Sequence, residues 1–266
     1  MVFVTGDTHN QFARFELRNA KELYLPSKER KYVLICGDCG GIMDEMSACR
    51  FINIFRGKPF TLLFIDGNHE NFTLLNQYPE VDFMGGKAHK IYENIYHLER
   101  GYVFTIDGYR FFCMGGARSV DIQDGILDRA DFNSWDELKK KARELDYKFA
   151  NYRIKGVTWW EEEMPTEQEM QRGLEQLAKC DYKVDFIITH SFPSKICRAW
   201  GYTETDRLCD YFDKISEMVE CTAWISGHYH SDRPVSATLI KRCGLKSMPY
   251  ITLYRAILML NMGQKF

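Results

Sequence analysis

The sequence predicts an α/β fold that begins with a parallel sheet. Three short apolar stretches, at residues 2–4, 31–36 and 59–65, have the composition of buried strands, and helix-like segments separate them. Such alternation favours parallel strands joined by right-handed crossovers. Between residues 95 and 116 the pattern changes to short alternating strands, which predicts a second, partly antiparallel sheet.

The helices expected in the first part of the chain lie between these strands. Residues 12–25 mix charged and apolar side chains at helical spacing and are followed by Pro26, so we expect a surface helix there. Residues 42–56 show a second helical pattern. Each of the three strands ends at a turn that contains a glycine and an aspartate, which allows the backbone to turn sharply there.

The rest of the chain continues with strands and helices. Asp107 and Gly108 predict a hairpin turn between strands at 102–106 and 109–114. Further strands are expected at 184–189 and 222–226, and the apolar tail at 250–262 is expected to complete one sheet. Further helices are expected at residues 131–152, 166–180, which starts with a capping-box pattern, and 206–219. No linker or internal repeat divides residues 1–266, which predicts a single domain.

Composition and charge exclude several classes of protein. A net charge of −2 over 266 residues argues against a chain that mainly grips nucleic acid, although a local basic groove is compatible with that total. No apolar run is long enough to span a membrane and no signal peptide is recognisable, so we expect a cytoplasmic protein. The nine cysteines, an odd number, do not suggest a disulfide framework. Cys36 and Cys39 form a C-x-x-C without a second pair, which argues against a structural zinc site.

Polar residues follow five of the predicted strands. They are Asp7 and His9, Asp38, Asn68 and His69, His190, and His228 and His230. A single histidine after a strand is more often a structural residue than a metal ligand, but five of the seven histidines occur at these strand ends. Ligands of α/β sheets bind beyond the carboxyl ends of the strands. The pattern therefore predicts a metal site at that edge, whereas His89 and His97 fit no such pattern and are expected to be structural.

The number of candidate ligands favours two ions over one. Oxygen and imidazole ligands without well-placed thiolates suit manganese, iron or zinc, with nickel and cobalt as alternatives, and we expect Mn²⁺ first. If one carboxylate bridges the ions, each ion receives four protein ligands and keeps positions for water and substrate. Paired ions about 3.5 to 4 Å apart stabilise the attacking and leaving oxygens of a phosphoryl displacement.

At this point the chain resembles a known family. Five motifs resemble, in order, those of the calcineurin-like metallophosphoesterases, and they are Gly6-Asp7-Thr8-His9, Gly37-Asp38, Gly67-Asn68-His69-Glu70, Thr189-His190 and Gly227-His228-Tyr229-His230. The resemblance extends from residue 6 to residue 230. It implies a four-layer α/β/β/α sandwich of two mixed sheets flanked by helices, the metallo-dependent phosphatase fold, with a dinuclear site at the sheet edges.

The resemblance also implies a role for each motif residue. One ion would be bound by Asp7, His9 and His230, the other by Asn68, His190 and His228, and Asp38 would bridge them. His69 would lie near the leaving oxygen as a general acid, with a hydrogen-bonded structural role as the alternative. The expected activity is phosphoester hydrolysis, in which a metal-bridging hydroxide attacks the phosphorus of a small or nucleotide-like phosphomonoester or phosphodiester.

Two further stretches resemble elements that occur near the metals in bacterial and phage members of the family. They are Gly115-Gly116-Ala117-Arg118-Ser119-Val120-Asp121 and Trp159-Trp160-Glu161-Glu162-Glu163. Arg118 is expected to bind the substrate phosphate together with Asn68. A hairpin turn and core packing are the alternatives for the glycines and the tryptophans. The segment between them is longer than usual, which predicts a helical insertion at about 123–150, a candidate lid or specificity element.

The departures from the family pattern narrow the function. Gly41 and Ile42 stand where the Ser/Thr protein phosphatases carry an acid and an arginine, which argues against that class, although Glu70 matches it. We therefore expect a small phosphorylated substrate, and neither nucleic acid nor a membrane as partner. A nuclease, a protein phosphatase of the same fold and a non-catalytic scaffold are the alternatives.

Overall fold

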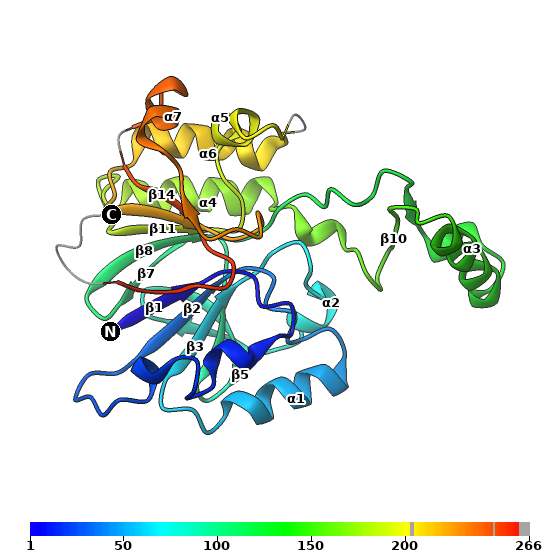
Figure 1. The fold of residues 1–266 in the computed structure, drawn as a ribbon, viewed down its shortest axis with the longest axis horizontal. Coiled ribbons are helices and arrows are strands. Elements are labelled where there is room, and N and C mark those ends of the chain that lie inside the picture. Colours follow the sequence, from blue (N-terminus) through cyan, green and yellow to red (C-terminus); the bar gives the residue numbers. More distant parts are fainter. Residues whose placement is uncertain (203–204, 247, 261–266) are drawn as a thin grey trace.

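Two stacked sheets lie between outer layers of helices in the computed structural model, which describes residues 1–202, 205–246 and 248–260 (Figure 1). In these residues the first sheet has seven strands in the order β15-β1-β2-β3-β6-β5-β4. The strands of this sheet are β1 Val2–Thr5, β2 Tyr32–Cys36, β3 Thr61–Ile65, β4 Glu80–Phe83, β5 Gly86–Tyr92, β6 Ile95–Leu98 and β15 Ile257–Leu260. Strands β1, β2, β3 and β6 are parallel, as the strand and helix alternation predicts for the first three.

The second sheet has six strands within the described residues, in the order β13-β14-β12-β11-β8-β7. They are β7 Tyr102–Ile106, β8 Tyr109–Met114, β11 Phe186–Thr189, β12 Ala223–Ser226, β13 Arg233–Pro234 and β14 Tyr250–Thr252. The hairpin predicted at Asp107 and Gly108 is confirmed, because β7 and β8 pair in antiparallel register around it. Both sheets are mixed, as predicted.

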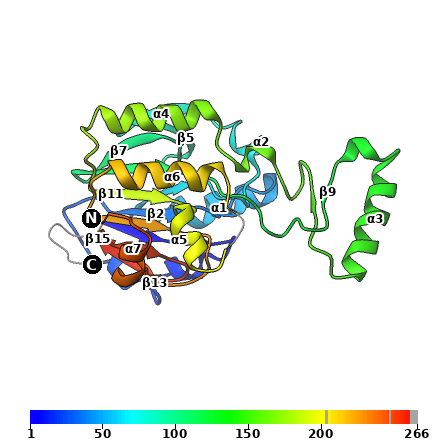
Figure 2. The ribbon, with the colours of Figure 1, turned by 90° about the horizontal axis from the view of Figure 1, so that it is seen from above.

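Helices cover the outer face of each sheet (Figures 1 and 2). The first sheet carries α1 Glu45–Phe55 and α2 Phe72–Leu75, together with two 3₁₀ helices at Phe12–Phe15 and Lys21–Leu23. The second sheet carries α4 Glu167–Ala178, α5 Ser194–Ala199, α6 Arg207–Met218 and α7 Ala237–Arg242. None of the helices in the described segments combines the length and the apolar character needed to cross a bilayer.

Three apolar cores hold these four layers together. Phe104, Phe111 and Phe186 pack between the two sheets. Phe51 belongs to the core under α1, and Phe212 belongs to the core between the second sheet and its helices. Burying large aromatic side chains in all three cores fixes the distance between the layers, and with it the relative position of the strand ends.

The segment between β8 and α4 leaves the sandwich and extends away from it (Figures 1 and 2). It contains α3 Trp135–Tyr147, the helix predicted within residues 131–152, and two short paired strands, β9 Ile126–Leu127 and β10 Arg153–Ile154. Short 3₁₀ helices at Arg129–Asp131 and Glu161–Glu163 flank these elements. The interpretation of residues 123–150 as an insertion into a single domain stays a prediction.

The surface helix predicted at residues 12–25 is wrong. The structure has two short 3₁₀ helices there, and their inward residues are spaced by three, Phe12 with Phe15 and Ala20 with Leu23. Side chains three residues apart eclipse in a 3₁₀ helix, so this spacing buries both pairs against the first sheet without a continuous α-helix.

The prediction that the tail at 250–262 completes one sheet is also wrong. The strand β14 joins the second sheet beside β12, and β15 joins the first sheet beside β1. The apolar composition of a run predicts a buried strand but does not say which sheet the strand joins. The last two residues of the predicted tail, Asn261 and Met262, lie outside the described residues.

Candidate metal centre

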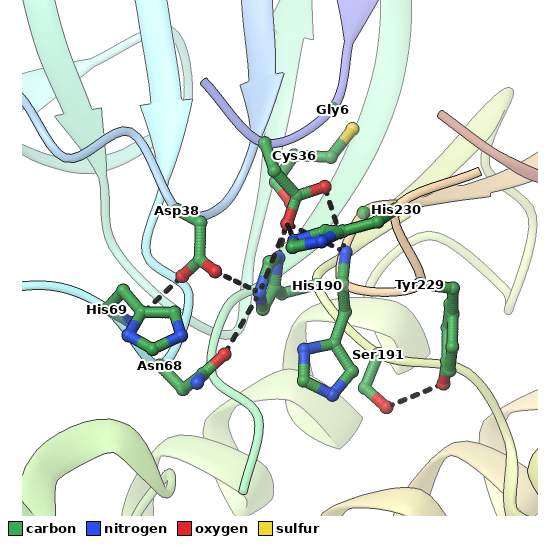
Figure 3. Close-up of polar contacts among 12 residues, drawn as sticks. Gly6, Cys36, Asp38, Asn68, His69, His190, Ser191, Tyr229 and His230 are labelled. Carbon is green, nitrogen blue, oxygen red and sulfur yellow. Dashed lines mark hydrogen bonds and ion pairs between the residues drawn. The ribbon is translucent and has the colours of Figure 1, made fainter. Parts of the chain in front are cut away.

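The carboxyl ends of β1, β2, β3, β11 and β12 meet at one end of the sandwich and bring most of the predicted ligands together (Figure 3). Two groups of donor atoms within the described residues could each hold a metal ion, with all atoms of a group within 4.8 Å of one another. The first group contains Asp7, His9 and His230, and the second contains Asp7, Asp38 and His190. Distant strand ends therefore converge, as the motif pattern predicts.

The first group is the more open one. His9 Nε2 lies 3.1 Å from His230 Nε2, and His230 Nε2 lies 3.9 Å from Asp7 Oδ1. About half of the His230 side chain is exposed, whereas Asp7 is buried. Two imidazole nitrogens that face each other beside a carboxylate form a donor set suited to a divalent cation at the surface end of the site.

The second group is buried. His190 Nε2 lies 3.4 Å from Asp38 Oδ2, 3.8 Å from Asp7 Oδ1 and 3.3 Å from Asn68 Oδ1. On the other side of the ring, His190 Nδ1 donates to the carbonyl oxygen of Cys36 at 2.7 Å. A backbone hydrogen bond at Nδ1 leaves Nε2 as the atom that faces the site, which is the usual arrangement of a metal-binding histidine.

Asp38 belongs to the buried group and also lies close to the open one. Its Oδ2 atom is 3.6 Å from His9 Nε2 as well as 3.4 Å from His190 Nε2. Its Oδ1 atom accepts a hydrogen bond from the backbone N–H of His69. Asp38 therefore approaches both donor groups, although Asp7 is the residue that belongs to both of them.

Among the predicted histidine ligands, His228 is the one that joins neither of these groups, and the predicted ligand Asn68 also lies outside them. Its backbone N–H donates to both carboxylate oxygens of Asp7 at 3.0 Å, and its ring lies against the His190 ring with a centroid distance of 5.1 Å. In this structure His228 therefore fixes Asp7 through its main chain and borders the buried group through its ring.

The backbone around the site is held in an uncommon conformation. His9, Asp38, His228 and His230 all have positive φ angles, of 43°, 51°, 70° and 45°. Positive φ in residues other than glycine is unfavourable, and it concentrates where function requires a particular orientation. A Cβ atom on Gly67 would lie only 2.1 Å from Asp38 Oδ1, so this position has room only for glycine. The backbone of these turns therefore adopts an uncommon conformation at the residues that carry the donor atoms.

Burial and the two carboxylates shape the electrostatics of the site. Burial raises the pKa of Asp7. Burial alone would lower the pKa of His190, but the charges of Asp38 and Asp7 raise it to about 10. Burial and the neighbouring His190 lower the pKa of His228 to about 3. The two buried carboxylates therefore favour the charged form of His190, as they would favour a bound cation.

The two further stretches singled out in the sequence meet at Asn68. Asn68 Nδ2 donates to Ser119 Oγ at 3.2 Å, and Ser119 donates to Glu163 through Oγ at 2.6 Å and through its backbone N–H at 3.0 Å. This chain turns the amide oxygen of Asn68 toward His190. Ser119 and Glu163 belong to the predicted stretches, but sequence patterns alone did not single them out.

Other residues of the two stretches are placed as follows. Arg118 is exposed in the loop after β8, and its predicted contact with the substrate stays a prediction. Trp160 is buried, in agreement with the core-packing alternative, and its Nε1 atom donates to Thr73 Oγ1 at 3.0 Å.

Arg153 binds both carboxylate oxygens of Asp121, and the charges of Arg153 and Asp121 affect the pKa of His69. The extended segment therefore contributes to the surroundings of the site.

His69 lies at the edge of the centre. Its ring is 5.5 Å from the His9 ring, measured between centroids. Burial lowers the pKa of His69, and the charge of Asp38 raises it.

Gly41 stands at the position where the Ser/Thr protein phosphatases carry an acid. A Cβ atom on Gly41 would lie 2.5 Å from the Phe51 ring. Packing of α1 on the sheet therefore leaves no room for that acid, which agrees with the sequence.

Two arginines near the site, the buried Arg100 and the half-buried Arg14, carried no sequence signal. Asp66 is 1% exposed and accepts hydrogen bonds from Arg100 Nε at 2.8 Å and Nη2 at 2.5 Å, with His97 Nε2 3.1 Å away. Arg14 donates to the carbonyl oxygens of Asp7, Gly6 and Tyr254. The partners of both arginines are distant in sequence or are main-chain atoms, so no local motif marks them.

Comparisons with known proteins give a family and a similar structure. Residues 1–232 match the profile of the Metallophos family, described as calcineurin-like phosphoesterase. No curated protein matches the chain. Among solved structures, the chain is similar to the crystal structure of phosphopantetheinyl hydrolase (PptH) from Mycobacterium tuberculosis, with 15% identity and a TM-score of 0.44, over 95% of this chain and 89% of that chain.

Proposed function

The chain belongs to the calcineurin-like phosphoesterase family, whose members are hydrolases that act on phosphoric ester bonds, and we propose that it hydrolyses a small or nucleotide-like phosphate ester at a two-metal centre. The observation that carries the proposal is the convergence of Asp7, Asp38 and His190 with His9 and His230 in two overlapping donor groups. Overlapping groups suit paired ions that share a carboxylate.

The donor set fits divalent cations. In the proposal Asp7, His9 and His230 hold one ion, Asn68, His190 and His228 hold the other, and Asp38 lies between them. The placement of Asp38 Oδ2 between His9 and His190 supports this division. Oxygen and imidazole donors without thiolate favour Mn²⁺, with Fe, Zn, Ni and Co as alternatives. When bound, the two cations supply Lewis acidity and a nucleophile near neutral pH.

The chain's own residues orient the substrate and move the proton. Asn68, whose amide nitrogen donates to Ser119 Oγ, and Arg118 are proposed to bind phosphoryl oxygens of the substrate. His69 is proposed to give a proton to the leaving oxygen. The hydrogen bond from its main chain to Asp38 supports this role, since it ties His69 to the proposed bridging residue.

The test combines metal analysis with two model substrates. The purified protein is loaded with Mn²⁺, its metal content is measured, and hydrolysis of p-nitrophenyl phosphate and of bis(p-nitrophenyl) phosphate is followed. We expect two ions per chain and turnover of at least one ester. A protein that holds no metal and hydrolyses neither ester would favour a non-catalytic scaffold. Binding to long DNA or RNA that weakens steeply with salt would favour a nuclease instead.

A further inference from the structure

A pocket adjoins the metal centre on the side of His69. It has a volume of about 370 Å³ and is lined by His9 and His69 from the centre. Its other wall comes from α1 and the turn before it, and includes Met43, Met46 and Arg50. Since His69 is the proposed donor of a proton to the leaving oxygen, the leaving group of the substrate would lie in this pocket.

The helix α1 holds two of these side chains on one face. Met46 and Arg50 are four residues apart, so they lie one above the other on the helix surface. The helix begins at a capping box in which Asp44 accepts a hydrogen bond from the Ser47 N–H at 2.7 Å, and its inner face packs through Phe51 and Phe55. The capping box and this packing therefore fix the backbone from which Met46 and Arg50 extend.

The chemistry of this wall suits a flat, polarisable group. The thioethers of Met43 and Met46 make favourable contacts with aromatic rings, and Met46 is 72% exposed although it is apolar. Arg50 also lines the pocket, and guanidinium groups in general stack on aromatic faces and donate hydrogen bonds to ring acceptors. Asp44 also lines the pocket and offsets part of the Arg50 charge, which argues against a second phosphate as the main ligand.

We propose that this pocket binds a nucleobase, so that the substrate is a nucleotide whose nucleoside part is the leaving group, held between Met46 and Arg50. A base offers a flat aromatic face to the thioether and acceptor atoms to the guanidinium. The volume falls within the range of small-ligand sites. The inference rests on the proposed function for the direction of the leaving group, but the binding of a base can be measured without turnover.

The experiment compares two phosphonates that differ only in the base. These are the analogues of adenosine 5′-monophosphate and of ribose 5-phosphate in which a methylene group replaces the ester oxygen, and their binding to the Mn²⁺-loaded protein is measured by titration calorimetry. We expect the adenosine compound to bind about tenfold more tightly. Arg50→Ala and Met46→Ala should each weaken its binding about three- to tenfold and leave the ribose compound unchanged.

Two control variants separate the pocket from general surface effects. Arg56→Ala removes an exposed cation at the end of the same helix, and Met218→Ala removes a partly exposed methionine of α6. Neither Arg56 nor Met218 lines the pocket. Equal binding of both phosphonates, or unchanged adenosine binding in both pocket variants, would overturn the assignment. If base-dependent binding is found but no phosphate ester is hydrolysed with two ions bound, the pocket assignment stands and the proposed hydrolase function fails.

Discussion

Asp38 Oδ1 accepts a hydrogen bond from the backbone N–H of His69 at 2.9 Å, which joins the end of β2 to the turn after β3. The other oxygen of Asp38 faces His190 and His9. One buried carboxylate therefore links the proposed general acid to both donor groups.

Asp38→Asn is expected to weaken both ions and to lower kcat/KM by at least about 100-fold. The amide keeps the size of the side chain and still accepts from His69, but it loses the charge and one acceptor oxygen between the two groups. Metal content by elemental analysis and hydrolysis of p-nitrophenyl phosphate measure the two effects. A variant that keeps two ions and full activity would show that Asp38 does not bridge.

His69→Gln is expected to leave the metal content unchanged and to slow the hydrolysis of alkyl phosphates about 100- to 10,000-fold. Esters of p-nitrophenol should be affected much less, because their leaving group is stable without a proton. The measurement is kcat/KM over a series of leaving groups. An equal loss for all of them would argue for a structural role of His69.

Glu163→Gln is expected to weaken metal binding by about 10- to 100-fold without unfolding the chain. The carboxylate accepts two hydrogen bonds from Ser119, and Ser119 in turn holds the amide of Asn68. A glutamine side chain has only one acceptor oxygen, so the chain to Asn68 is no longer fixed. The measurement is a metal titration with a chelator of known affinity.

The matched control for Glu163 is its neighbour Glu161, which is exposed in the same 3₁₀ helix. Glu161→Gln should bind metal as the unchanged protein does. If both variants behave alike, the hydrogen-bond chain to Asn68 has no influence on the centre.

Metal binding is expected to release a proton from His190. Without a metal ion its pKa is raised to about 10 by Asp38 and Asp7, so the ring is protonated at neutral pH, whereas a metal ligand must be neutral. The pKa of His228 is lowered to about 3, so it contributes no proton. Metal affinity should therefore rise about tenfold per pH unit between pH 7 and 9.

Titration calorimetry in buffers of different ionisation enthalpy measures the proton released. One proton per pair of ions near pH 7.5 is the expected result. Binding heats that are independent of the buffer would show that His190 is already neutral before the metal binds.

Asp66→Asn is expected to lower the free energy of unfolding by about 3 to 5 kcal/mol, because it removes the buried carboxylate that pairs with Arg100 and leaves only the more exposed Glu169, at 3.6 Å, as a charged partner. Denaturant unfolding at pH 7 measures the loss. Asp82→Asn is the control, since Asp82 is 89% exposed and pairs with Lys87 at the surface, where an ion pair contributes at most about 1 kcal/mol.

The effect of Asp66 should depend on pH. Burial alone would raise the pKa of Asp66, but Arg100 and His97 hold it well below its ordinary value. A depressed pKa in the folded state gives stability above the pKa of the unfolded chain, about 3.9, and this stability is lost as the pH falls further. The difference between the unchanged protein and Asp66→Asn should therefore shrink below about pH 4. A constant difference would contradict the charge argument.

The strands and the polar strand ends could be predicted because their signals are local. A buried strand followed by glycine and aspartate is visible within ten residues, and Asp7, Asp38 and His190 each follow this pattern or end such a strand. Parallel strands then bring these ends to one edge without further information. The same reasoning gave the two sheets and the hairpin at Asp107.

The parts that could not be predicted depend on contacts between distant residues. Ser119 and Glu163 are 44 residues apart in sequence and meet beside Asn68, and Arg100 meets Asp66 beyond the ends of neighbouring strands. The apolar spacing at Phe12 and Phe15 is compatible with either helix type, and packing on the sheet decided it. The division of the tail between two sheets likewise depends on which edges are free.

The pairing of Val2 with Leu260 has a consequence for how this protein is made. A ribosome delivers β1 first, yet the strand that covers its outer edge emerges only after both sheets have otherwise been synthesised. Until then β1 has an uncovered edge on the side away from β2, where other chains can add. Nascent chains that stop before residue 257 should therefore be retained by chaperones or aggregate, even though every proposed metal ligand has already been translated.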